Sequence, residues 1–188
     1  MDWDTLGNAL DEISGTPDRA PRLDAYRELL ADLSPGDEGW AEVQMCLADD
    51  LLTDGHVDDA RTAYQLALED GGRTVLAPET GLLVVALTEG DSAQVDELLA
   101  LLLTRSRAEG LVVGDYAWIG ESLEESGRLR AALRWFTIPL RDIQPGDIDL
   151  MPIVCLTGRW RVRRALDLPV DAYDEAYDVW HEVDAAAP

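Results

Sequence analysis

A pattern of apolar, small, turn-forming and aromatic residues begins at Leu47 and recurs 72 residues later, at Ile119. Small residues let two helices approach closely, glycine permits a tight turn, and an aromatic ring fills the space beside the next helix pair. The pattern therefore predicts helical hairpins, with Ala60 and Ala132 at the helix crossings. The two copies read Leu47-Ala48-x2-Leu51-x3-Gly55-x4-Ala60-x3-Tyr64 and Ile119-Gly120-x2-Leu123-x3-Gly127-x4-Ala132-x3-Phe136.

A degenerate copy lies between these two. Gly90 follows Gly55 by 35 residues, and Asp91 is placed to cap the helix that comes after it. Val95 replaces the alanine expected at the helix crossing, so this hairpin should pack differently. Three consecutive hairpins are therefore expected, the last of them near residues 112–142.

Helical periodicity continues to both ends of the chain. Trp3, Leu6 and Leu10 share one helix face, and a long helix is expected from Asp147 onward with Leu150 facing inward. A final helix should follow Pro169, and no segment alternates with the period of a strand. We expect an all-α protein, an α-solenoid of about ten helices that forms one domain over residues 1–188 and ends in a capping helix pair.

The two good copies resemble the tetratricopeptide repeat, whose period is about 34 residues. This resemblance extends from Trp40 to Pro145. The segment Arg159–Pro169 resembles the one that closes a group of bacterial repeat proteins, many of which carry a zinc motif similar to that at the C-terminus of the SecA translocase. Cys46 and Cys155 are isolated and cannot supply that motif, so no metal site is implied.

In proteins of the tetratricopeptide family the first helix of each hairpin lines a concave groove. The resemblance implies a non-catalytic scaffold whose groove is acidic at its ends and apolar in its middle, and which binds a protein or peptide with a basic and apolar segment. The basic groove residues with which some relatives clamp a C-terminal carboxylate are missing. The groove positions implied are Glu42, Met45, Asp49 and Leu52, then Thr80, Val84 and Leu87, and finally Ala117, Glu121, Glu124 and Glu125.

The chain is strongly acidic, with 38 acidic residues against 15 basic ones and a net charge of −23. This field should repel nucleic acid and anionic membranes and attract basic partners, although an acidic surface can also serve solubility alone. The charge is unevenly distributed, because residues 128–164 contain eight arginines and three acids.

Two alternative functions remain open from the sequence. An anionic ligand or nucleic acid could bind the basic helix through its guanidinium groups, unless these groups pair with the chain's own acids. A dimerisation module could use the aromatic residues Trp160, Tyr173, Tyr177 and Trp180, which allows a monomer or a weak homodimer. The residues of the basic helix are Arg159, Trp160, Arg161, Arg163 and Arg164.

No catalytic, metal or cofactor motif is present. His56 lies in an acidic inter-helix turn that lacks the ligand spacing of a calcium loop, and the sequence contains no nucleophile elbow, Walker loop or dinucleotide fingerprint. We therefore expect no enzymatic activity and no cofactor. The N-terminus lacks the apolar region of a signal peptide, which favours a cytoplasmic protein.

Overall fold

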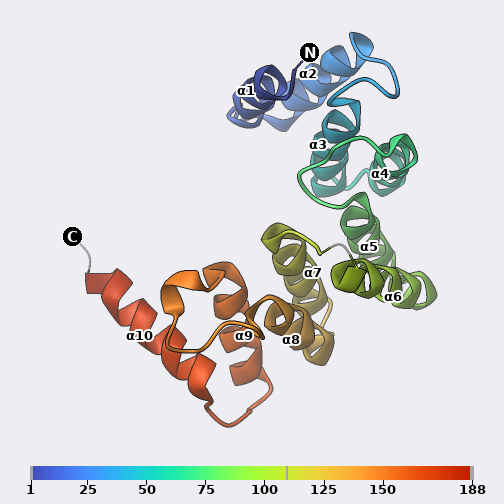
Figure 1. The fold of residues 1–188 in the computed structure, drawn as a ribbon. Coiled ribbons are helices and arrows are strands. Elements are labelled where there is room, and N and C mark those ends of the chain that lie inside the picture. Colours follow the sequence, from blue (N-terminus) through green and yellow to red (C-terminus); the bar gives the residue numbers. More distant parts are fainter. Residues whose placement is uncertain (1, 109, 187–188) are drawn as a thin grey trace. The chain divides into compact units, whose positions relative to one another are not determined.

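The computed structural model describes residues 2–108 and 110–186, and every regular element within these ranges is helical (Figure 1). The predicted all-α class is confirmed. Two 3₁₀ helices, Ile138–Leu140 and Ile148–Leu150, accompany ten α-helices in the described residues. The α-helices are α1 (Trp3–Ser14), α2 (Arg19–Ala31), α3 (Trp40–Thr53), α4 (Val57–Asp70), α5 (Pro78–Glu89), α6 (Ser92–Ala108), α7 (Val113–Glu125), α8 (Leu129–Thr137), α9 (Ile153–Ala165) and α10 (Ala172–Ala186).

The chain divides into two compact units, Met1–Arg107 and Ala108–Pro188. In the first unit α1 packs against α2, α2 against α3, and α3 against both α4 and α5. In the second unit α7 packs against α8, α9 against both of them, and α10 against α9. A single domain over residues 1–188 stays a prediction.

The hairpins turn at glycines in the left-handed conformation, as the glycine spacing predicts. Gly55 has a φ of 83°, Gly90 of 73° and Gly127 of 77°, values at which a side chain would be strained. Each turn is closed by the backbone hydrogen bond that ends a helix in a Schellman motif. These bonds run from the N–H of His56 to the carbonyl of Leu51 (2.9 Å), from Asp91 to Ala86 (3.0 Å) and from Arg128 to Leu123 (2.8 Å).

The helix α9 ends in the same way without a glycine. Asp167 adopts a φ of 53°, and the N–H of Leu168 donates to the carbonyl of Arg163 at 3.1 Å. Aspartate enters the left-handed region more readily than most residues, because its short polar side chain can hydrogen-bond locally. The α9–α10 turn therefore shares the geometry of the other three, although its sequence lacks their signature.

Aromatic rings of α4 and α8 pack against glycines of other helices. The fully buried ring of Tyr64 lies against Gly81 of α5, so a methyl group at that position would overlap the ring. Phe136 of α8 lies against both Gly120 of α7 and Gly158 of α9. The close approach at Gly120 was expected from the repeat, whereas those at Gly81 and Gly158 were not.

The prediction of a long helix from Asp147 onward is wrong. A short 3₁₀ helix occupies residues 148–150, and α9 begins only at Ile153. The cause is Pro152, because proline disfavours helical dihedrals in the residue before it, and Met151 has an extended ψ of 135°. Leu150, expected to face inward, is 71% exposed.

The ring–glycine contact gives a stability prediction. Gly81→Ala should lower the free energy of unfolding by about 1–3 kcal/mol, because the added methyl forces the Tyr64 ring or α5 to move. The control is Gly7→Ala in α1, where an added methyl meets no atom within 4 Å, and which should raise stability by about 0.5–1 kcal/mol through helix propensity. Urea unfolding measures both, and equal effects of the two changes would contradict the contact.

Candidate functional site

The structure places the implied groove residues in both units and gives them unequal access to solvent. Glu42 and Met45 are buried on α3, and Thr80 and Ala117 are buried on α5 and α7. Glu125 is exposed at the end of α7. The half-buried positions are Asp49 and Leu52 on α3, Val84 and Leu87 on α5, and Glu121 and Glu124 on α7.

A pocket of about 240 Å³ lies in the first unit among α1, α2, α3 and the segment that precedes α5. Its walls are mainly apolar and aromatic, and they carry two carboxylates, Asp11 and Glu42. Glu42 is the one implied groove residue that lines it. The lining residues are Trp3, Leu6, Gly7, Leu10, Asp11, Ser14, Tyr26, Glu42, Cys46 and Val75.

Glu42 is only 8% exposed, and its Oε2 accepts a hydrogen bond from the backbone N–H of Val75 at 2.8 Å. Its Oε1 makes no hydrogen bond or ion pair with any residue that the structure describes. Burial raises the pKa of this carboxyl, while the Val75 N–H and the charge of Arg73 lower it. Glu42 thus lines the pocket and has one carboxylate oxygen without a partner among the described residues.

Arg73 lies at the edge of the same region. Its guanidinium carbon stands 4.1 Å from the centroid of the Trp3 ring, within the range of a cation–π interaction. Because Trp3 also lines the pocket and Arg73 acts on the charge of Glu42, this part of the unit already accommodates one cationic group beside an aromatic ring.

Asp49, implied to face a partner, bonds within the protein. The hydroxyl of Tyr64 donates to its Oδ1 at 2.5 Å. Burial raises the pKa of Asp49 to about 6, with smaller contributions from the charges of Glu42 and Asp50, and the Tyr64 hydroxyl opposes this rise. Asp49 is therefore a half-buried carboxyl with a structural role in the first unit.

The arginines of α9 pair with carboxylates of their own unit. Arg159 is 5% exposed and binds Asp171 at 2.5 Å and Asp174 at 3.3 Å. Arg163 binds Asp174 at 2.9 Å and also contacts Asp171. This cluster fastens the turn before α10 to α9.

The other two arginines of this helix are more exposed. Arg161 donates twice to Glu124 of α7, at 2.7 and 2.6 Å. Arg164 stacks on the Trp160 ring at 4.2 Å and lies 4.0 Å from Asp178. Glu124, another implied groove residue, is thereby engaged inside the second unit.

The aromatic residues considered for dimerisation pack largely within the second unit. Tyr177 is 8% exposed and belongs to the core cluster of Leu140 and Leu156, against which Trp160, Tyr173 and Trp180 pack partly buried. The Tyr173 hydroxyl donates to the backbone carbonyls of Leu140 and Ile143, at 3.1 and 2.9 Å. These residues hold α10 on its unit, so most of their surface is already covered.

The sequence analysis missed most of the pocket. It placed Trp3, Leu6 and Leu10 on one helix face but assigned them only to packing. One feature of the sequence could have indicated the pocket. The short N-terminal helix carries several large apolar residues, and a single neighbouring helix cannot cover all of them.

Neither cysteine has the character of a reactive thiol, since burial raises the pKa of both Cys46 and Cys155 to about 12. Within residues 2–108 and 110–182, no three histidine, cysteine or acidic side chains are grouped as metal ligands. No described helix has the length and apolar character needed to cross a membrane.

The raised pKa of Asp49 gives a pH prediction. A carboxyl whose pKa is higher in the folded than in the unfolded state stabilises the fold when protonated, and this contribution is lost as pH rises from about 4 through 6. Asp49→Asn should therefore gain stability relative to the wild type over that interval. Urea unfolding at several pH values measures the difference, and a difference that does not change with pH would contradict it. Tyr64→Phe, which removes the opposing hydrogen bond, should extend the pH-dependent interval upward.

The buried ion pairs give a second prediction for the site. Arg159→Met should lower the free energy of unfolding by on the order of 3 kcal/mol, because it leaves Asp171 and Asp174 with less compensation. The matched control Arg134→Gln, at an exposed arginine of the same unit, should stay within about 0.5 kcal/mol. Thermal and urea unfolding measure the stability of both variants. An equal loss of stability in the two would mean that the Arg159 cluster contributes little to the stability of the fold.

Comparison with known proteins yields no relative. No protein-family model matches this sequence, and no match was found among curated proteins or solved structures.

Proposed function

We propose that this protein is a non-catalytic scaffold that binds a basic and apolar segment of a partner protein, with the pocket among α1, α2 and α3 as its anchor site. The observation that carries the proposal is the unbonded Oε1 of Glu42 in a pocket whose walls are otherwise mainly apolar. A carboxylate so placed favours a cationic donor, and its apolar surroundings favour the stem of a long side chain.

The size of the pocket supports a side chain as its occupant. Its volume of about 240 Å³ lies below the range of roughly 300–1,000 Å³ that is typical of pockets for small molecules and cofactors. An arginine or lysine side chain, with an apolar neighbour against Leu6 or Leu10, would fill this space. Anchors of this kind supply most of the affinity of a peptide interface.

The charge of the first unit supports the same partner class. Residues 1–107 contain 23 acidic residues and 7 arginines. Such a field speeds the encounter with a basic segment, and it acts mainly on the association rate and on selectivity. Asp11 at the wall of the pocket would add a second acceptor close to the anchor.

The proposal extends to the architecture. We take the hairpins as tetratricopeptide-like repeats stacked as in an α-solenoid, which makes the half-buried Val84 and Leu87 of α5 a continuation of the binding surface in the first unit. Within the second unit, Glu121 and Glu125 of α7 are the corresponding proposed contacts. On this proposal the protein acts in the cytoplasm, as a monomer or weak homodimer, without a cofactor.

An array of short synthetic peptides, in which basic and apolar content are varied independently, tests the proposal. The wild type should prefer peptides with arginine or lysine beside an apolar or aromatic residue. Glu42→Gln should weaken binding of these peptides by about tenfold, the worth of one charge-assisted hydrogen bond. The control Glu28→Gln removes the same charge from an exposed position of α2 outside the pocket and should have little effect.

Two outcomes would contradict this function. One is binding that does not depend on basic content, and the other is an equal loss in Glu42→Gln and Glu28→Gln. A discrete, salt-sensitive complex with DNA in a gel shift, lost on changing Arg161 and Arg164, would instead favour the anionic-ligand alternative.

A further inference from the structure

Most arginines of this chain are used internally. With 38 acidic residues available, at least nine of the 15 arginines pair with carboxylates in the described structure. Four arginines have no ion pair or hydrogen-bonded side chain among the described residues: Arg73 and Arg107 of the first unit, and Arg130 and Arg134 of α8, although Arg73 stacks on Trp3. Of these, only Arg130 and Arg134 lie one turn apart on the same helix. Arg141, just beyond α8, donates to the backbone carbonyl of Ile138 at 3.3 Å. In so acidic a chain, unpaired arginines are an informative exception.

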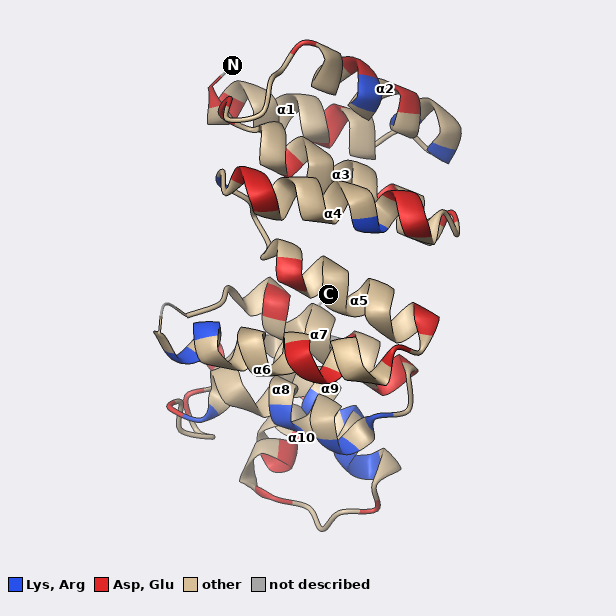
Figure 2. Ribbon diagram, turned by 90° about the vertical axis from the view of Figure 1, so that its right-hand side faces the viewer, with Lys and Arg blue, Asp and Glu red and all other residues tan. Residues whose placement is uncertain are grey.

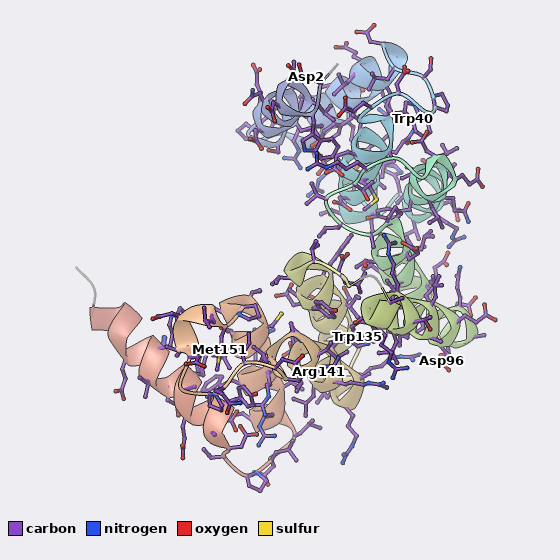
Figure 3. The ribbon with its side chains drawn as sticks, viewed as in Figure 1. Asp2, Trp40, Asp96, Trp135, Arg141 and Met151 are labelled. Carbon is purple, nitrogen blue, oxygen red and sulfur yellow. The ribbon has the colours of Figure 1, made fainter. Side chains whose placement is uncertain are left out.

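These arginines stand on a firmly packed helix. The opposite face of α8 buries Ala132, Trp135 and Phe136. Trp135, which is labelled in Figure 3, packs against Tyr116 of α7, and their ring centroids lie 6.1 Å apart. Arg130 and Arg134 are exposed and one helical turn apart. The helix thus fixes the backbone positions of two exposed arginines one turn apart. Figure 2 shows arginine segments of this unit on α8 and α9.

An open groove of about 440 Å³ adjoins the first of them. It lies where the α7–α8 turn meets the C-terminal end of α9. Leu129 and Leu166 line it, both half-buried, so it offers apolar surface beside positive charge. The lining residues are Gly127, Arg128, Leu129, Arg130, Ala131 and Leu166.

We propose that α8 and this groove form a docking surface for an acidic helical segment of a partner protein. Two carboxylates one turn apart on such a segment match the spacing of Arg130 and Arg134, and each can accept two hydrogen bonds from a guanidinium. An apolar side chain of the same segment would enter the groove beside Leu129 and Leu166. This surface belongs to the second unit and does not depend on the pocket of the first.

The charge of the chain decides between an acidic peptide and a nucleic acid. A nucleic acid carries phosphates along its whole length, and most of them would face the field of a chain with a net charge of −23. A segment with two carboxylates brings little charge beyond what the two arginines neutralise. The groove also favours binding of an apolar side chain, and a phosphate backbone has none.

A displayed library of short random peptides, selected against the full-length protein, tests the docking surface. The variant is Arg130→Gln combined with Arg134→Gln. The control combines Arg27→Gln with Arg107→Gln, which makes the same change in net charge at exposed positions of the first unit. Circular dichroism of both variants verifies that the fold is retained.

The expected result is a class of peptides with acidic residues three or four positions apart and an apolar residue nearby. Their affinity should fall by more than about tenfold in the α8 variant and by less than about twofold in the control. Absence of such a class, or its equal retention on the α8 variant, would overturn the proposal. Tighter binding of single-stranded DNA than of these peptides, through the same two arginines, would also overturn it. The proposed site of the first unit is tested separately, by the loss of binding to basic peptides in Glu42→Gln.

Discussion

The packing of an aromatic ring against a glycine backbone sets how closely helices approach in each compact unit. Tyr64 against Gly81 brings α4 and α5 together in the first unit, and Phe136 between Gly120 and Gly158 does so for α7, α8 and α9 in the second. Close-packed interiors leave no room for an extra methyl at such points, so the contact fixes the helix spacing. The position of α8, which carries one of the two proposed binding surfaces, depends on this contact.

Much of this fold could be predicted from local sequence, because a turn glycine and the apolar residues before it act within a few residues. The turns at Gly55, Gly90 and Gly127 follow from that signal. The predicted long helix from Asp147 is wrong because of Pro152. The apolar periodicity continues through this proline, but its ring disfavours a helical conformation in the residue before it. Gly81 could not be assigned a role because its partner ring belongs to another helix.

The candidate sites were harder to predict, because the availability of a charged side chain depends on tertiary pairing. Glu124 and Arg161 were assigned to different surfaces, yet they bond to each other. Asp49 was placed on a binding face, and the hydroxyl of Tyr64 holds it within the protein. Arg130 and Arg134 belong to no motif, and what distinguishes them is that both lack an ion pair among the described residues and lie one turn apart on α8. The acidic field, by contrast, follows from composition and is independent of the fold.

Hydrogen exchange of the full chain, with and without a bound basic and apolar peptide, tests the central claim most directly, because it reports which backbone amides the ligand protects. Our account predicts slower exchange in α1, in α2 and in the first half of α3, together with the segment around Val75. It predicts little change in residues 153–182. Protection confined to the second unit, or a complex that protects no part of α1 and α3, would contradict the assignment of the binding site.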